Sequence, residues 1–125
     1  MDITPLIPAG RQVINKYGNG DFVIATVRHT GSVLVCQNQT IPLGIDSLTE
    51  LTLDILAPLK EAEPSVELLL IGSGKSMGFV EDDIRQGLKS WGISLDVMDT
   101  GAAARTYNVL LSEERRVAAA LIAVE

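Results

Sequence analysis

The segment 72–78 has the residue types of a binding loop. It reads Gly-Ser-Gly-Lys-Ser-Met-Gly, follows an apolar run and precedes an amphipathic pattern. Backbone N–H groups in such a strand-to-helix turn can bind an anion, and Lys75 adds a positive charge. The P-loop pattern fails because Leu69 stands where its first glycine belongs, and the dinucleotide pattern fails because Met77 occupies the third glycine position. Two interpretations stay open, an anion site and a turn whose glycines allow close packing.

A second polar group stands in the segment 98–108, which reads Met-Asp-Thr-Gly-Ala-Ala-Ala-Arg-Thr-Tyr-Asn. Its small residues allow a helix to approach a sheet or another subunit closely. The donors and acceptors that follow, from Arg105 to Asn108, fall within about one helical turn and could contact a ligand or a partner. In the structural interpretation, Asp99 caps the helix, Arg105 pairs with a neighbour and Asn108 satisfies a buried loop.

Both segments follow predicted strands, so we expect them to meet at one edge of a sheet and to form a cleft there. The predicted binding residues are Gly72, Ser73, Gly74, Lys75, Asp99, Thr100, Arg105, Thr106, Tyr107 and Asn108.

The sequence indicates no catalytic centre. General acid–base chemistry needs a group that titrates near neutrality, and only Asp99 and Lys75 have a suitable context. Ser73 and Ser76 lack an identifiable activating base. No cluster has the spacing of metal ligands, and we expect neither a metal nor a cofactor. Cys36, the single cysteine, permits no intrachain disulfide, and its apolar neighbours predict a buried side chain.

Composition predicts one soluble globular domain over residues 1–125. The chain is 46% apolar, enough for a core, and carries a net charge of −6. This charge argues against nucleic acid as a main partner, since Arg115 and Arg116 form the sole adjacent basic pair. The first residues lack the pattern of a secretory signal, and no apolar run approaches the ~20 residues that span a bilayer. We therefore expect a cytoplasmic protein.

The first half of the chain predicts an antiparallel meander. Strand patterns cover Val13–Tyr17, Phe22–Val27, Ser32–Cys36 and Thr40–Pro42. The first two are joined by Asn19-Gly20, a pair that favours a tight hairpin turn.

The second half alternates helices and strands, which predicts an α/β fold with a mixed sheet and packed helices. Ser47 and Glu50 form a capping-box pattern before a helix that Pro58 would kink. The predicted elements in chain order are a helix around 48–59, a buried strand over 66–71, a helix over 80–91 ending at Gly92, a strand over 94–98, a helix from Asp99 or Thr100 to about 111, and a strand over 117–124.

The run Ile71-Gly72-Ser73-Gly74 and the segment 98–108 resemble the signature of a family of small α/β proteins of unknown function. Its eukaryotic relatives include mitochondrial complex I assembly factor 3 and an adipogenesis-associated cytosolic protein. The resemblance extends over about residues 14–124. The family's residues would map onto Gly72, Gly74, Asp99, Thr100, Arg105, Thr106, Tyr107 and Asn108.

This resemblance implies a three-layer α/β fold around a mixed central sheet, with an additional antiparallel portion. It implies action through protein contacts, with respiratory-complex subunits as partners, and no settled catalytic activity. The chain departs from the family at two places: it has no tryptophan near Gly44-Ile45 and no proline in the loop before Val80. These departures weaken the transfer of one specific partner.

Three functional interpretations follow. The leading one is an interaction or assembly-type protein that uses the cleft at Gly72–Gly78 and Asp99–Asn108. The alternative is a protein or enzyme that binds a small anionic molecule in the same cleft. In the third, the polar residues are structural and the working surface lies elsewhere, for example at a homodimer face.

Overall fold

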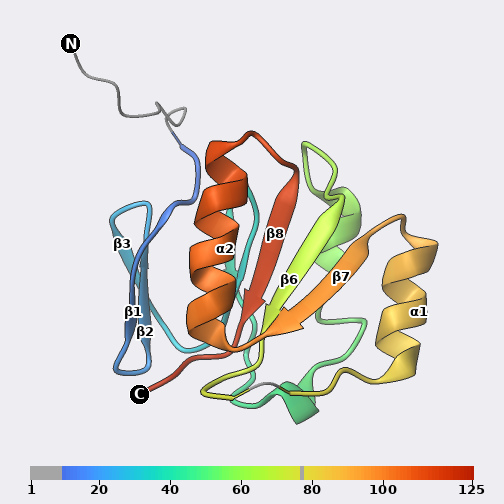
Figure 1. Cartoon of the computed structure of the whole chain (residues 1–125), viewed down its shortest axis with the longest axis horizontal. Coiled ribbons are helices and arrows are strands. Elements are labelled where there is room, and N and C mark those ends of the chain that lie inside the picture. Colours follow the sequence, from blue (N-terminus) through green and yellow to red (C-terminus); the bar gives the residue numbers. More distant parts are fainter. Residues whose placement is uncertain (1–9, 77) are drawn as a thin grey trace.

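A five-stranded mixed sheet forms the centre of the fold, and a three-stranded antiparallel sheet lies beside it (Figure 1). The computed structural model describes residues 10–76 and 78–125. The expectation about a secretory signal concerns the first residues and lies outside this part of the chain. The predicted α/β class, with a mixed sheet, an antiparallel N-terminal portion and packed helices, is confirmed.

The small sheet is a meander of three strands, β1 (Ile14–Gly18), β2 (Asp21–Ile24) and β3 (Val27–Thr30). The predicted Asn-Gly hairpin joins β1 to β2, with φ of 55° at Asn19 and 77° at Gly20. These two positive angles give the turn a twist that matches its flanking strands.

The single strand expected over 22–27 is divided by a second two-residue turn. Ala25 and Thr26 both adopt positive φ, 48° and 67°. Neither residue type favours this conformation, so the sequence gives no turn signal here. The Asn15 side chain supports the turn by accepting a hydrogen bond from the Thr26 N–H at 2.8 Å.

The large sheet has the strand order β5-β4-β8-β6-β7. Its strands are β4 (Val33–Val35), β5 (Thr40–Pro42), β6 (Leu68–Gly72), β7 (Ser94–Met98) and β8 (Val117–Leu121). The predicted C-terminal strand is thus central: it runs parallel to β6 and antiparallel to β4. The expected meander is split between the sheets, because β4 and β5 pair within the large one.

Two α-helices pack on opposite faces of the large sheet, which gives three layers (Figure 1). On one face, α1 (Asp82–Ser90) buries Ile84 and Leu88, and Gly92 beyond its end has a φ of +77°. On the other, α2 (Thr100–Ser112) begins at its predicted cap, where the Asp99 carboxylate accepts a hydrogen bond from the Ala102 N–H at 2.8 Å.

The prediction of one helix around residues 48–59 is wrong. The segment instead contains two short 3₁₀ helices, η1 (Leu48–Glu50) and η2 (Ala57–Glu61). The capping box of Ser47 and Glu50 forms as predicted, but the backbone at Leu51 becomes extended and ends the first turn. Pro58 then lies in the first turn of η2, where its missing N–H costs no hydrogen bond.

Candidate functional site

The two predicted segments meet at the carboxyl ends of β6 and β7. The Ser73 N–H donates to the Met98 carbonyl at 2.8 Å, and the Thr100 N–H donates to the Gly74 carbonyl at 2.9 Å. We define the rim as the residues that this crossing holds together. They are Gly72, Ser73, Gly74, Lys75, Asp99 and Thr100, six of the ten predicted site residues.

The polar groups of the rim bind mainly to one another. The fully buried Thr100 hydroxyl accepts a hydrogen bond from the Gly74 N–H at 2.9 Å and donates to the Ile122 carbonyl at 2.7 Å. The Ser73 hydroxyl lies 2.6 Å from the Ser76 carbonyl oxygen, and the Asp99 carboxylate is occupied as a helix cap. Several donors that an anion would need are therefore already engaged within the chain.

Gly72 has a packing role at this crossing. A Cβ added there would lie 2.9 Å from the Thr100 Cα and 2.9 Å from the Leu121 Cδ2. The first of these atoms belongs to the backbone, so a side chain could be accommodated only if the start of α2 moved. This geometry favours the structural interpretation of Gly72.

The remaining four predicted residues lie farther along α2, and the structure does not bring them into one cleft with the rim. With a rise of about 1.5 Å per residue, Asn108 lies roughly 12 Å along the helix axis from Thr100. The four side chains also diverge. Tyr107 enters the core, Arg105 and Asn108 contact β1, and Thr106 lies half-buried on the other flank of the helix.

Tyr107 is fully buried, and its hydroxyl donates to the Cys36 carbonyl at 3.4 Å. Burial raises the pKa of the Tyr107 phenol well above its ordinary value, and burial likewise raises the pKa of the Cys36 thiol. Both groups are therefore neutral near pH 7, and the thiol is a poor nucleophile. The predicted burial of Cys36 is confirmed.

Asn108 attaches the small sheet to α2. Its side-chain amide donates to the Ile14 carbonyl at 2.7 Å and accepts from the Ile14 N–H at 2.9 Å, as a neighbouring strand would. Nearby, the Arg105 guanidinium donates to the Tyr17 hydroxyl at 2.9 Å. Both side chains line an open depression of about 370 Å³ between β1 and α2. Asn108 thus satisfies backbone groups, as the structural interpretation expected.

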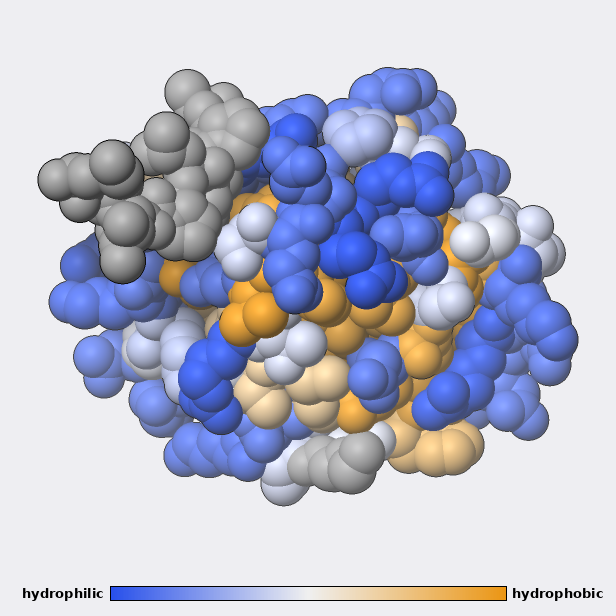
Figure 2. Space-filling model, turned by 45° about the horizontal axis from the view of Figure 1, so that its top comes forward, coloured by the Kyte–Doolittle hydropathy of each residue, from blue (hydrophilic) through white to orange (hydrophobic). Residues whose placement is uncertain are grey.

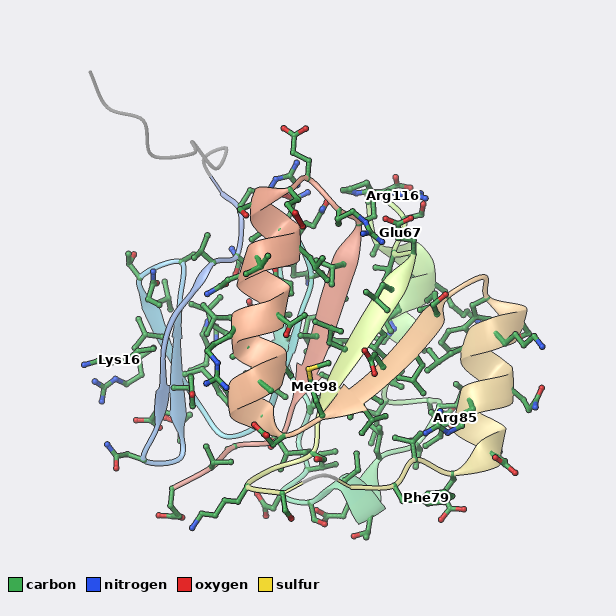
Figure 3. The ribbon with its side chains drawn as sticks, viewed as in Figure 1. Lys16, Glu67, Phe79, Arg85, Met98 and Arg116 are labelled. Atoms are coloured by element: carbon green, nitrogen blue, oxygen red, sulfur yellow. The ribbon has the colours of Figure 1, made fainter. Side chains whose placement is uncertain are left out.

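The adjacent arginines predicted as the basic pair both contact the carboxylate of Glu67, and Figure 3 shows Arg116 beside it. The Glu67 Oε1 atom lies 3.1 Å from the Arg115 Nε atom, and the Glu67 Oε2 atom lies 3.5 Å from the Arg116 Nη2 atom. The hydrogen bond from Arg115 is the main cause that lowers the pKa of Glu67 below its ordinary value. The single carboxylate offsets one of the two positive charges, which leaves this cluster a small electrostatic footprint for a phosphate backbone.

The sequence did not reveal a partly uncovered face of the large sheet, which we call the open sheet face. Its half-buried residues are Leu68, Met98, Thr106 and Leu110, and the exposed Ser94 and Asp96 of β7 lie on the same side of the sheet. The pairing of Leu68 with Ser94 and of Gly72 with Met98 puts these strand residues on the α2 side of the sheet. Figure 2 shows apolar side chains gathered in a strip within a hydrophilic surface, and Figure 3 shows Met98 beside α2.

A second apolar surface was also missed. Phe79 is 73% exposed and lines a cleft of about 260 Å³ with Leu48, Leu51 and Val80. The sequence does carry a signal for the exposure of Phe79: this residue falls outside the helical stripe of Val80 and Ile84, whose side chains face the core.

Two kinds of feature are absent from the described residues. No three or more His, Cys, Asp or Glu side chains among them are grouped so that they could hold a metal ion. No helix in this part of the chain is long and apolar enough to cross a membrane.

The comparisons identify relatives along almost the whole chain. A family described as "Protein of unknown function (DUF498/DUF598)" matches residues 14–122. An uncharacterized protein of Rhodobacter capsulatus is 38% identical over 115 residues, which make up 91% of this chain and 86% of that protein. NADH dehydrogenase (ubiquinone) 1 alpha subcomplex assembly factor 3 of Xenopus tropicalis is 28% identical over 109 residues, 87% of this chain and 60% of the relative.

A solved structure described as an outer membrane protein from Bartonella henselae shares the fold with a TM-score of 0.84. It is 40% identical, and the match covers 93% of this chain and 98% of that one. The fold is thus shared with an experimentally determined structure over nearly its full length.

We predict that Gly72→Ala lowers the free energy of unfolding by about 1–3 kcal/mol, because the added methyl group overpacks the crossing with Thr100. Urea denaturation measures this loss. Ser76→Ala, in the same loop, is the control and should stay within about 0.5 kcal/mol of the wild type. Equal stability of the two variants would contradict the packing role of Gly72.

We predict that Asn108→Ala lowers the free energy of unfolding by about 1–3 kcal/mol, because it leaves the N–H and carbonyl groups of Ile14 without their partner. Hydrogen exchange should accelerate at the Ile14 amide more than at the central β8 amides. Arg105→Ala removes only an exposed contact with Tyr17 and serves as the control. If both variants accelerated exchange equally, Asn108 would not be the attachment point.

Proposed function

This chain belongs to the DUF498/DUF598 family, and from this premise we propose that it is an assembly-type factor that acts by binding a protein partner. The resemblance predicted from the two segments is thereby confirmed. The family description names no activity, so support for the role comes from relatives named as assembly factors. The proposed partners are subunits of the NADH dehydrogenase complex. Because the chain spans about three fifths of the Xenopus tropicalis relative, the identity of the partner is itself part of the proposal.

The observation that carries the proposal is the open sheet face. Leu68 and Met98 remain half-buried, whereas Leu70, on the same side of the sheet, is covered by α2. An apolar strip within a hydrophilic surface is typical of a site that a protein partner covers (Figure 2). Thr106 and Leu110 form its wall, so one predicted site residue belongs to this surface.

The alternative, an anionic ligand at the rim, has less support. The N–H groups of Ser73, Gly74 and Thr100 donate to groups of the chain itself. Lys75 is exposed and available, but a single lysine without converging backbone donors makes a weak anion site. The geometry therefore favours contact with a protein.

The cytoplasmic location expected from the sequence stays part of the proposal. The Bartonella henselae relative is described as an outer membrane protein, so cell fractionation should accompany the binding experiment. Recovery of this chain in the soluble fraction supports the location, and recovery with the membranes contradicts it.

We predict that the tagged chain, purified from its native cells, carries NADH dehydrogenase subunits identifiable by mass spectrometry. Thr106→Arg should reduce their recovery at least about tenfold, equivalent to about 1.4 kcal/mol of binding free energy, because the long charged side chain obstructs the open sheet face. Val109→Arg is the matched control, since Val109 is 57% exposed on the same helix but does not line this face.

Recovery of the chain alone would count against the assembly role. Equal loss with Thr106→Arg and Val109→Arg would refute the proposed surface and leave the assembly role standing.

A further inference from the structure

The second apolar surface is the Phe79 cleft, at the end of the molecule where the loop after β6 leads into α1 (Figures 1 and 3). Phe79 is 73% exposed, more than the other exposed large apolar side chains of the described residues, Val27 and Val109 among them. The cleft residues are Leu48, Thr49, Leu51, Gly78, Phe79, Val80, Glu81 and Ile84.

The walls of the cleft are fixed by packing and hydrogen bonds. A Cβ on Gly78 would lie 2.7 Å from the Leu48 Cδ2 and 2.9 Å from the Ser73 Cβ. The backbone at Gly78 is therefore packed closely against the side chains of Leu48 and Ser73. On the other side, the Arg85 guanidinium donates to the Val80 carbonyl at 3.2 Å. Such a preformed cleft loses little conformational entropy when a partner binds.

Negative charge is concentrated in the segments that form this cleft, and Glu81 lines it directly. These segments carry more exposed acidic groups than basic ones; the acidic residues are Asp46, Glu50, Glu81, Asp82 and Asp83, and the basic ones are Lys75 and Arg85. The ion pairs of the described residues involve other carboxylates, those of Asp21 and Glu67. Glu50 and Asp83 accept backbone hydrogen bonds, but no basic side chain of the described residues neutralises the five carboxylates. Their negative charge can therefore attract a basic partner.

We propose that the Phe79 cleft binds a basic amphipathic segment of a partner protein. Apolar side chains of that segment would contact Phe79 and Leu48, while its lysines and arginines would lie against the surrounding carboxylates. A second copy of this chain would bring the same acidic surround and be repelled. An anionic lipid surface would be repelled for the same reason. A basic protein segment is the occupant that satisfies both the apolar floor and the charge.

This proposal goes beyond the assembly role and concerns a different surface. Leu51, Val80 and Ile84 belong to the core on the α1 side of the large sheet, whereas Leu68 and Met98 pack on the α2 side. The two surfaces can be altered separately.

The experiment titrates the isotope-labelled full chain with helical probe peptides of about 15 residues, near the length at which isolated helices become stable. One peptide carries leucines on one face and lysines elsewhere, and the second has glutamate in place of every lysine. We expect amide shifts at Leu48–Leu51 and Phe79–Ile84 with the lysine peptide, and binding at least about tenfold weaker for the glutamate peptide.

Two variants test the parts of the cleft. Phe79→Ser should weaken binding of the lysine peptide at least about tenfold, as loss of an aromatic anchor does. Val109→Ser, which removes an exposed apolar side chain elsewhere, should leave it unchanged. Glu81→Gln combined with Asp82→Asn should reduce the preference for lysine over glutamate while the apolar contact remains. Circular dichroism and thermal unfolding confirm that each variant is folded.

Equal affinity for the two peptides, no binding of either, or equal binding by the Phe79→Ser and Val109→Ser variants would overturn the proposal. If this occurred while NADH dehydrogenase subunits still co-purified, the assembly role would stand and only the Phe79 cleft would be rejected.

Discussion

The buried hydroxyl of Thr100 joins three parts of the chain that are far apart in sequence. It accepts a hydrogen bond from the Gly74 N–H and donates to the Ile122 carbonyl, so it connects the loop after β6, the start of α2 and the end of β8. The missing side chain of Gly72 allows these segments to approach so closely. A buried hydroxyl left without partners would be costly, so this arrangement fixes where α2 begins.

The position of α2 then determines the rest of the α2 side of the molecule. Tyr107 reaches the core beneath β4, and Asn108 pairs with the backbone of Ile14. The small sheet is thereby held against α2, and its Gly20 N–H also donates directly to the Val124 carbonyl beyond β8 at 2.8 Å. Three of the polar groups that looked available in the sequence, those of Thr100, Tyr107 and Asn108, are used to build this arrangement.

Two accessible surfaces are apolar. The open sheet face lies on the α2 side and the Phe79 cleft on the α1 side, while the hydrogen-bonding groups of the rim are largely engaged. A protein with such surfaces is better suited to protein contacts than to holding a small anion. In the proposed interaction, the acidic residues near Phe79 would add selectivity, because opposite charges attract and like charges repel.

The sequence by itself determined the elements whose signals are local: the Asn19-Gly20 hairpin, the Asp99 cap, the helix before Gly92 and the buried strands β6 and β8. It also indicated the family and the meeting of two segments at one sheet edge. Tertiary structure decided which sheet β4 and β5 join, which way Arg105 to Asn108 point, and that 48–61 forms 3₁₀ turns. Those outcomes depend on packing between segments far apart in the chain, and a local pattern carries no information about which distant partner a strand or a side chain will meet.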